Sequence, residues 1–136
     1  MTKQVQAAYQ IAFDEFERLS REGGADQPSA KMLEVEEGLY LEQDMALLQD
    51  QKKTGYKVEG KPSTSRSRAA AGAVKGDSDP RLTIQVCEDR RGSFSVNPDG
   101  RRVEDRLSEG YVYAKLVNGR VKLVNVDTSE VAQCAW

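Results

Sequence analysis

Apolar side chains in the first 25 residues follow the spacing of a helix with one buried face. They recur at steps of three and four residues, while charged side chains occupy the other faces. The apolar positions are Val5, Ala8, Tyr9, Ala12, Phe16 and Leu19. Gly23 and Gly24 follow, and glycine commonly ends a helix. The pattern therefore predicts a first helix that stops before Gly23.

Two further helices are predicted before residue 55. Ser29 is a candidate N-cap for a short helix that carries Met32, Leu33 and Val35. A longer helix follows, with an apolar stripe formed by Leu41, Met45 and Leu48 and with Leu47 beside it. Gly55 suits the position that ends this helix. Residues 1–55 are thus expected to form three helices.

Beyond residue 80 the period changes to two, which is typical of a half-buried strand. Leu82, Ile84 and Val86 alternate with more polar neighbours. Two further strands are predicted at residues 111–117 and 121–126, joined by a turn at Asn118-Gly119. This dipeptide is a strong hairpin signal because a type I′ turn requires positive φ at both positions. A second turn is expected at residues 97–100, an Asn-Pro-Asp-Gly sequence with short arms at 94–96 and 101–103.

Residues 60–80 allow two interpretations. They are rich in Ser, Gly and Pro and have almost no large apolar side chain, which is typical of a linker. Alternatively, a long edge strand begins near Tyr56 and Val58, because edge strands tolerate proline and favour Lys and Arg. Composition alone favours the linker.

These elements predict an α+β fold. Three N-terminal helices would pack on one face of a curved, mostly antiparallel sheet of about four strands and close a cone around one core. The chain is 136 residues long, the size of one domain. We therefore expect a single domain over residues 1–136, with a helical part at 1–55 and a sheet part at 56–136.

Composition excludes several classes of function. The chain contains no histidine, which removes the commonest general base and metal ligand, and its two cysteines cannot form a zinc site alone. The formal net charge is −2, and residues 60–136 hold 13 Lys and Arg against 10 Asp and Glu, too few for a nucleic-acid footprint. No apolar run approaches the roughly 20 residues that span a bilayer. We predict a non-enzymatic protein with no cofactor, no metal and no nucleic-acid partner.

A tyrosine with a buried carboxylate is the one alternative for cavity catalysis. Such a pair can stabilise an oxyanion or abstract a proton. The candidates are Tyr9, Tyr40, Tyr56, Tyr111 and Tyr113, with Asp14 or Asp44. Tyrosines on helices and strands more commonly contribute apolar burial, and nothing in the sequence places such a pair in one pocket. We therefore predict no catalytic residue.

Cys87 and Cys134 are the only cysteines. If strands 81–88, 111–117 and 121–127 form a meander, the ends of the first and third lie roughly 10 Å apart at one edge. The tail after Asp127 is long enough to bring Cys134 within disulfide range of Cys87. Two free thiols are the alternative, and we favour the disulfide.

A disulfide implies an oxidising compartment outside the cytoplasm. The first residues, MTKQVQAAYQ, do not have the pattern of a signal peptide. We therefore expect that an export signal precedes this sequence in the native protein.

Taken in order, four features resemble the nuclear-transport-factor-2-like lipoproteins of actinobacteria and their phages. They are the segments TGYKVEGKPSTS, DPRLTIQVCEDRRGSFSVNPDGRRV and LVNGRVKLVNVD, and the closing Cys134. The resemblance implies a cone-shaped domain, a long first strand over residues 56–75, pairing of Cys87 with Cys134 and a lipid-anchored N-terminal tether. The chain departs from these relatives at Val121, where they commonly have Trp, and at Glu88-Asp89, where one acidic residue is usual.

A basic run is the one candidate contact surface. Lys61, Arg66, Arg68 and Lys75 have no acidic residue among them and are candidates for contact with anionic lipid headgroups or wall polymers. A solvated edge strand explains the same residues. Trp136, the last residue, is either an interface anchor or packs over the edge of the sheet.

The sequence therefore predicts a non-enzymatic, extracytoplasmic binding module held at the cell surface by a lipid anchor. Its partner would be a protein or a cell-envelope component, and the resemblance makes superinfection exclusion of phages one role. It also makes a homodimer an option. The alternative is a carrier or sensor of a small apolar ligand in the cone cavity.

Overall fold

Three α-helices form the first part of the fold in the computed structural model, which describes residues 1–70 and 79–136. They are α1 (Thr2–Arg21), α2 (Ala30–Val35) and α3 (Gly38–Thr54). The Ser29 side chain accepts a hydrogen bond from the Met32 amide and caps α2, and Gly55 ends α3 with a φ of 78°. The three predicted helices are confirmed with their caps.

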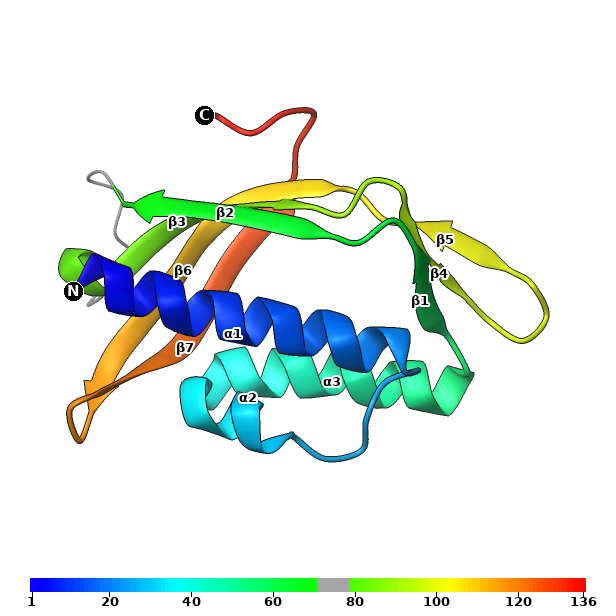
Figure 1. Ribbon diagram of the computed structural model, residues 1–136, viewed down its shortest axis with the longest axis horizontal. Coiled ribbons are helices and arrows are strands. Elements are labelled where there is room, and N and C mark those ends of the chain that lie inside the picture. Colours follow the sequence, from blue (N-terminus) through cyan, green and yellow to red (C-terminus); the bar gives the residue numbers. More distant parts are fainter. Residues whose placement is uncertain (71–78) are drawn as a thin grey trace.

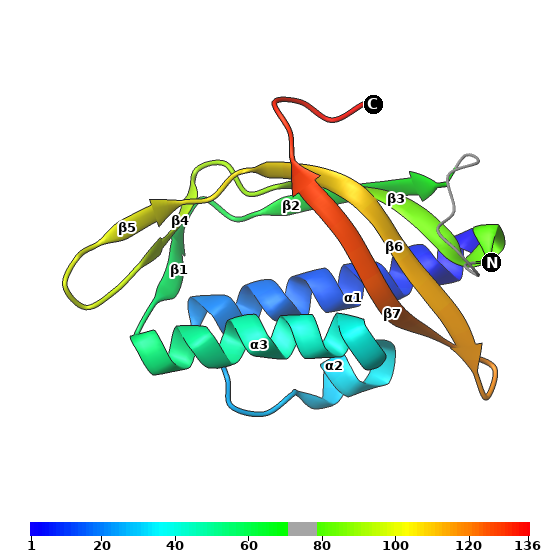
Figure 2. The ribbon, with the colours of Figure 1, turned by 180° about the vertical axis from the view of Figure 1, so that it is seen from behind.

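A four-stranded antiparallel sheet covers the helices (Figures 1 and 2). Its order is β2-β3-β6-β7, and its strands are β2 (Thr64–Ala69), β3 (Thr83–Asp89), β6 (Leu107–Val117) and β7 (Arg120–Glu130). A 3-10 turn, η1 (Pro80–Leu82), leads into β3. The meander of β3, β6 and β7 is the one predicted, and Asn118 and Gly119 have φ values of 54° and 78° in its hairpin.

A second antiparallel sheet of three strands lies at one end of the molecule (Figure 1). Its order is β1-β4-β5, with β1 (Lys57–Gly60), β4 (Ser93–Val96) and β5 (Arg102–Glu104). The predicted turn at residues 97–100 joins β4 to β5, and the Gly100 amide donates to the Asn97 carbonyl at 2.9 Å. The expectation of one sheet of about four strands is therefore corrected to two sheets, of four and three strands.

Residues 56–69 divide between the two sheets. Gly60 has a φ of 90°, and a side chain there would lie 2.5 Å from the Gly92 carbonyl oxygen, so the chain turns here where other residues would be strained. The strand then resumes as β2, on the edge of the large sheet. The edge-strand interpretation is confirmed for residues 64–69, and the linker interpretation is wrong there. The expectation of one long strand over 56–75 is also corrected, as far as residue 70; residues 71–75 lie outside the described residues.

Two groups of buried side chains form the core. The larger group joins α1 and α3 to the large sheet, and includes Val5, Tyr9, Ile84, Val112 and Leu123. The smaller group packs the three helices together through Leu19, Met32, Met45 and Leu48. All three helices contribute to both groups, so the two groups together fix the helices under the sheet.

The C-terminal tail returns to the outer face of the large sheet. Cys134 forms a disulfide with Cys87 on β3, with an S–S distance of 1.97 Å and a Cα–Cα distance of 6.1 Å. The predicted disulfide is present. Because a disulfide persists in an oxidising environment, the pairing is compatible with a location outside the cytoplasm.

Candidate functional site

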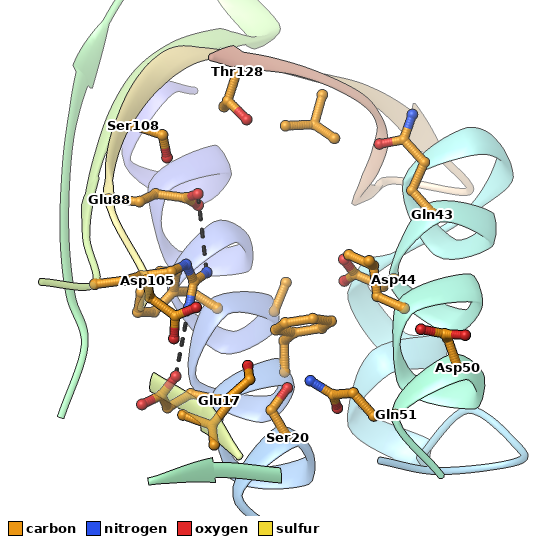
Figure 3. A pocket seen from close by; sticks show the side chains of 18 of the residues that line it. Glu17, Ser20, Gln43, Asp44, Asp50, Gln51, Glu88, Asp105, Ser108 and Thr128 are labelled. Atoms are coloured by element: carbon orange, nitrogen blue, oxygen red, sulfur yellow. Dashed lines mark hydrogen bonds and ion pairs between the residues drawn. The ribbon is translucent and has the colours of Figure 1, made fainter. Parts of the chain in front are cut away.

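A cavity of about 550 Å³ opens between the helices and the two sheets. Figure 3 shows its polar side chains pointing inward from α1, α3 and the strands. The lining residues on the helices are Ala12, Phe13, Phe16, Glu17, Ser20, Tyr40, Gln43, Asp44, Leu47, Asp50 and Gln51. Those on the strands and their connections are Tyr56, Val58, Glu88, Arg90, Ser95, Val103, Asp105, Ser108, Val126 and Thr128.

Helical spacing brings the two helical walls to the cavity. On α1 the lining positions Phe13, Phe16, Glu17 and Ser20 each lie three or four residues from another member of the set, so they share one face of the helix. The lining positions of α3 run from Tyr40 to Gln51 with the same spacing. Earlier residues of α1, namely Val5, Ala8 and Tyr9, pack in the core. The cavity therefore lies along the second half of this helix.

Arg90 carries the one positive charge on the described lining. Its guanidinium lies 3.5 Å from the Glu17 carboxylate and 3.9 Å from the Glu88 carboxylate (Figure 3). The same group lies over the rings of Phe13 and Phe16, at 4.6 and 5.9 Å from their centroids. Two carboxylates and two rings therefore hold this charge against one wall.

Glu88 also forms a hydrogen bond with Tyr9 of α1. The buried Tyr9 hydroxyl donates a hydrogen bond of 2.6 Å to Glu88 Oε2. Burial, and then the neighbouring Glu88 carboxylate, raise the pKa of Tyr9 far above its usual range, so this hydroxyl keeps its proton. The hydrogen bond from Tyr9 therefore fixes the position of the Glu88 side chain.

A second pair of carboxyl groups lies on the opposite side, at α3. Burial is the largest cause that raises the pKa of Asp44, which lines the cavity, and the Glu88 carboxylate also contributes. Glu36, which is 2 % exposed, has its pKa raised by burial and by Asp44 beside it. Glu36 therefore stays protonated at neutral pH, and Asp44 is the member of the pair that faces the cavity.

Two more carboxylates complete the acidic lining. Asp105 accepts a hydrogen bond of 2.6 Å from the Ser93 hydroxyl, which is fully buried. Asp50 is exposed on α3. Neither side chain forms an ion pair with a base in the described part of the chain.

Two buried oxygens on the lining have no hydrogen-bond partner among residues 1–70 and 79–136. They are the hydroxyl of Ser20, a residue that is 1 % exposed, and Oε1 of Gln51. Figure 3 shows both side chains at the same end of the cavity. Buried polar atoms are almost always satisfied, so these two indicate a place for polar groups that residues 1–70 and 79–136 do not supply.

The candidate catalytic residues separate into three groups. Tyr40, Tyr56 and Asp44 line the cavity, so the structure brings a tyrosine and a carboxyl group together where the sequence alone could not. Tyr9 does not line the cavity but donates a hydrogen bond to Glu88, which does. Tyr111 and Tyr113 lie on β6 with their ring centroids 6.5 Å apart, and Asp14 is exposed on α1 and accepts from Gln10. The absence of a catalytic role stays a prediction.

The structure describes three members of the basic run, namely Lys61, Arg66 and Arg68. Arg66 and Arg68 on β2 lie over the Trp136 ring, at 5.4 and 4.3 Å from its centroid, and Arg66 also donates to the Trp136 carbonyl. Lys61 follows β1, at the start of the connection to β2. Lys75 lies outside the described residues. Trp136 thus packs over the edge strand, and contact of the basic run with an anionic surface stays a prediction.

The sequence did not single out Arg90, Glu17 or Glu88 as a group. Glu17 and Arg90 are 73 positions apart and meet only because α1 crosses the end of β3. The sequence offered one indication of this group. The chain has two acidic residues at Glu88-Asp89, where the lipoproteins that it resembles usually have one.

Comparisons with known proteins add no further identification. Neither a protein-family model, nor a curated protein, nor a solved structure matches the chain. Over the described ranges, no group of three or more His, Cys, Asp or Glu residues is arranged to hold a metal ion. No helix in the same ranges has the length and apolar character needed to span a bilayer.

Proposed function

We propose that this protein is a non-enzymatic, extracytoplasmic binding domain that holds a small organic molecule between its helices and sheets. The cavity carries this proposal. Its volume of about 550 Å³ lies within the range of roughly 300–1,000 Å³ that is usual for small-molecule sites. A core filled by its own side chains would have left no such space.

The character of the lining supports the same function. Phe13, Phe16 and Tyr40 supply apolar area, and separate polar side chains from the helices and strands converge on the space (Figure 3). Ligand sites typically combine these two kinds of lining. Leu47 and Val103, which are 56 % and 54 % exposed, add apolar side chains that solvent can reach.

The location of the domain is the second part of the proposal. The Cys87–Cys134 disulfide supports export from the cytoplasm. A lipid anchor at the cell surface, and a cone of the nuclear-transport-factor-2-like type, rest on the sequence resemblance. An exported, anchored domain with an open cavity suits capture or sensing of a molecule from the surroundings.

Binding is tested with a fragment library screened by saturation-transfer NMR on the purified, oxidised protein. Two matched variants decide whether the hits use the cavity. Ser108→Phe places a ring on the β6 position that lines the cavity, and Ser129→Phe places the same ring on an exposed position of β7 that does not. Thermal unfolding of both variants checks that they fold.

The proposal expects hits that bind wild type and Ser129→Phe and that bind Ser108→Phe at least ~10-fold more weakly. Hits that bind all three proteins equally would place binding elsewhere and overturn the proposal. A library without any hit would also overturn it.

The protein-partner hypothesis is independent of the cavity. Superinfection exclusion predicts that a host displaying the anchored protein is plaqued less efficiently by some phages. Unchanged plaquing across a broad panel would contradict it. No contact among the described residues favours this role, so it stays a prediction from the resemblance.

A further inference from the structure

The charges on the cavity lining are strongly unequal. Five carboxyl groups line it, and the one basic group on the described lining is Arg90. The carboxyl groups are those of Glu17, Asp44, Asp50, Glu88 and Asp105. Because the surroundings are partly apolar and screen charge less than water does, this excess acts on any ligand that enters.

Arg90 does not balance the excess. Its guanidinium is already engaged by Glu17 and Glu88 and by the faces of Phe13 and Phe16. These contacts neutralise at most two of the five carboxylates. Asp44, Asp50 and Asp105 have no basic partner within the described ranges.

Two polar atoms without a partner add to this acidic lining. The Ser20 hydroxyl, on a residue that is 1 % exposed, and Gln51 Oε1 both line the cavity and lack a hydrogen-bond partner among the residues described. Gln51 Oε1 only accepts a hydrogen bond, whereas the Ser20 hydroxyl can accept one or donate one. Figure 3 shows Asp44 on the wall that also carries Gln51, with Ser20 opposite Gln51. With five carboxyl groups against one guanidinium, the charged groups of the lining present more acceptors than donors.

An alkylammonium group matches this surplus. It carries one positive charge and three N–H donors, and it accepts no hydrogen bond. Aromatic faces attract cations, and the stacking of Arg90 on Phe13 shows that a ring of this cavity already receives one. The apolar part of such a ligand would pack against the remaining rings and Leu47.

We propose that the cavity selects organic cations, namely amines with an apolar body, and that Asp44 is the principal counter-charge. This inference rests on the proposed function and narrows its ligand class. A carboxylate of the same shape is repelled by the lining. A neutral alcohol gains the apolar contacts without the ion pair.

The test compares probes that share a body and differ in charge. 2-Phenylethylamine, 2-phenylethanol and 3-phenylpropanoate are titrated into the full chain by calorimetry, together with the corresponding cyclohexyl and naphthyl compounds. If the cavity selects organic cations, each amine should bind at least ~10-fold more tightly than the alcohol with the same body, and the carboxylate should bind most weakly.

Asp44→Asn tests the assigned residue, and Asp14→Asn is its matched control because Asp14 is exposed on α1 away from the cavity. Asn removes the charge of Asp44 and keeps its shape. We expect Asp44→Asn to weaken amine binding by ~10-fold or more and to leave alcohol binding within about twofold. Ser20→Ala, which removes one acceptor, should weaken amine binding by a smaller factor.

The outcomes separate the two proposals. Alcohols or carboxylates that bind as tightly as the amines would overturn the selection of cations, as would an unchanged affinity of Asp44→Asn for the amines. Binding that Ser108→Phe blocks would still support the cavity as a ligand site in those cases. If no probe of any charge binds and the fragment library gives no hit, both proposals fail together.

Discussion

The hydroxyl of Tyr9 and the carboxylate of Glu88 join α1 to β3 through a hydrogen bond of 2.6 Å. Arg90 extends this contact, because it reaches Glu88 at 3.9 Å and Glu17 at 3.5 Å, and Glu17 lies two turns beyond Tyr9 on the same helix. The helix and the strand are therefore linked at two points along one cavity wall. In the proposed function, a ligand at that wall would depend on the positions that these links fix.

Tyr9→Phe tests the first link. The substitution leaves the buried ring in place and removes the donor to Glu88, so the free energy of unfolding should fall by about 1.5–3 kcal/mol, the range for hydrogen bonds to charged groups. The lower half of that range is expected because the Glu88 side chain is 15 % exposed and keeps Arg90. Urea denaturation followed by circular dichroism measures the change.

Tyr56→Phe is the control for this substitution. Tyr56 is half-buried on the cavity lining, and its hydroxyl forms no hydrogen bond to the other described residues. Its unfolding free energy should stay within about 0.5 kcal/mol of wild type. Equal losses in both variants would show that the Tyr9 hydroxyl contributes nothing specific.

Glu36→Gln tests the buried acid. Burial and the adjacent Asp44 raise the pKa of Glu36 in the folded state above its unfolded value of 4.5. The folded state therefore binds more protons than the unfolded state above pH 4.5, and stability falls as the pH rises from there toward the folded pKa. Glutamine mimics the protonated acid, so the variant should be more stable than wild type at pH 8, by on the order of 1–3 kcal/mol, and nearly equal to it at pH 4.

Thermal unfolding of both proteins from pH 4 to pH 8 measures this difference. Glu34→Gln is the control, because it makes the same change at an exposed position of α2. It should follow the wild-type profile throughout. A Glu36→Gln variant less stable than wild type at pH 8 would contradict the assignment of a protonated acid.

The Cys87→Ala/Cys134→Ala double variant tests the disulfide. The bridge joins residues 47 positions apart. Closing a loop of this length restricts the unfolded chain, and its removal should cost about 4 kcal/mol in the chain-entropy model. Guanidinium denaturation of the variant and of wild type, with and without reductant, measures the cost, and reductant should affect only wild type. Equal stability of both proteins in oxidising buffer would show that the bridge is absent in solution.

Local sequence patterns predicted the helices, the two turns and the meander because each depends on neighbouring residues. Ser29, Gly55 and the Asn118-Gly119 pair act through backbone geometry within a few positions. The division of residues 57–69 between two sheets depends on Gly60 meeting Gly92 across the structure. The exposed side chains of an edge strand resemble those of a linker, so composition could not separate the two.

The candidate site was less accessible to sequence reasoning. Tyr40, Tyr56 and Asp44 were among the residues considered, but their shared cavity required the packing of α3 against the sheets. Glu36 gave no signal in the sequence, although it is buried and its backbone forms a bridge with Leu123 on β7. The shared cavity and the burial of Glu36 both depend on tertiary packing. Short patterns in a single sequence do not reveal such packing.

Trp136 and the tyrosines of the cavity give the protein two separate optical reporters. It is the only tryptophan, and it lies against Arg66 and Arg68 on the face of β2 opposite the one that meets α1. The cavity is on the helical side of that sheet and has tyrosine and phenylalanine but no tryptophan on its described lining. Indole emission should therefore follow release of the tail from the sheet, whereas near-ultraviolet tyrosine signals should follow entry of a ligand. One sample can then show whether occupancy of the cavity is transmitted through the sheet to its outer face.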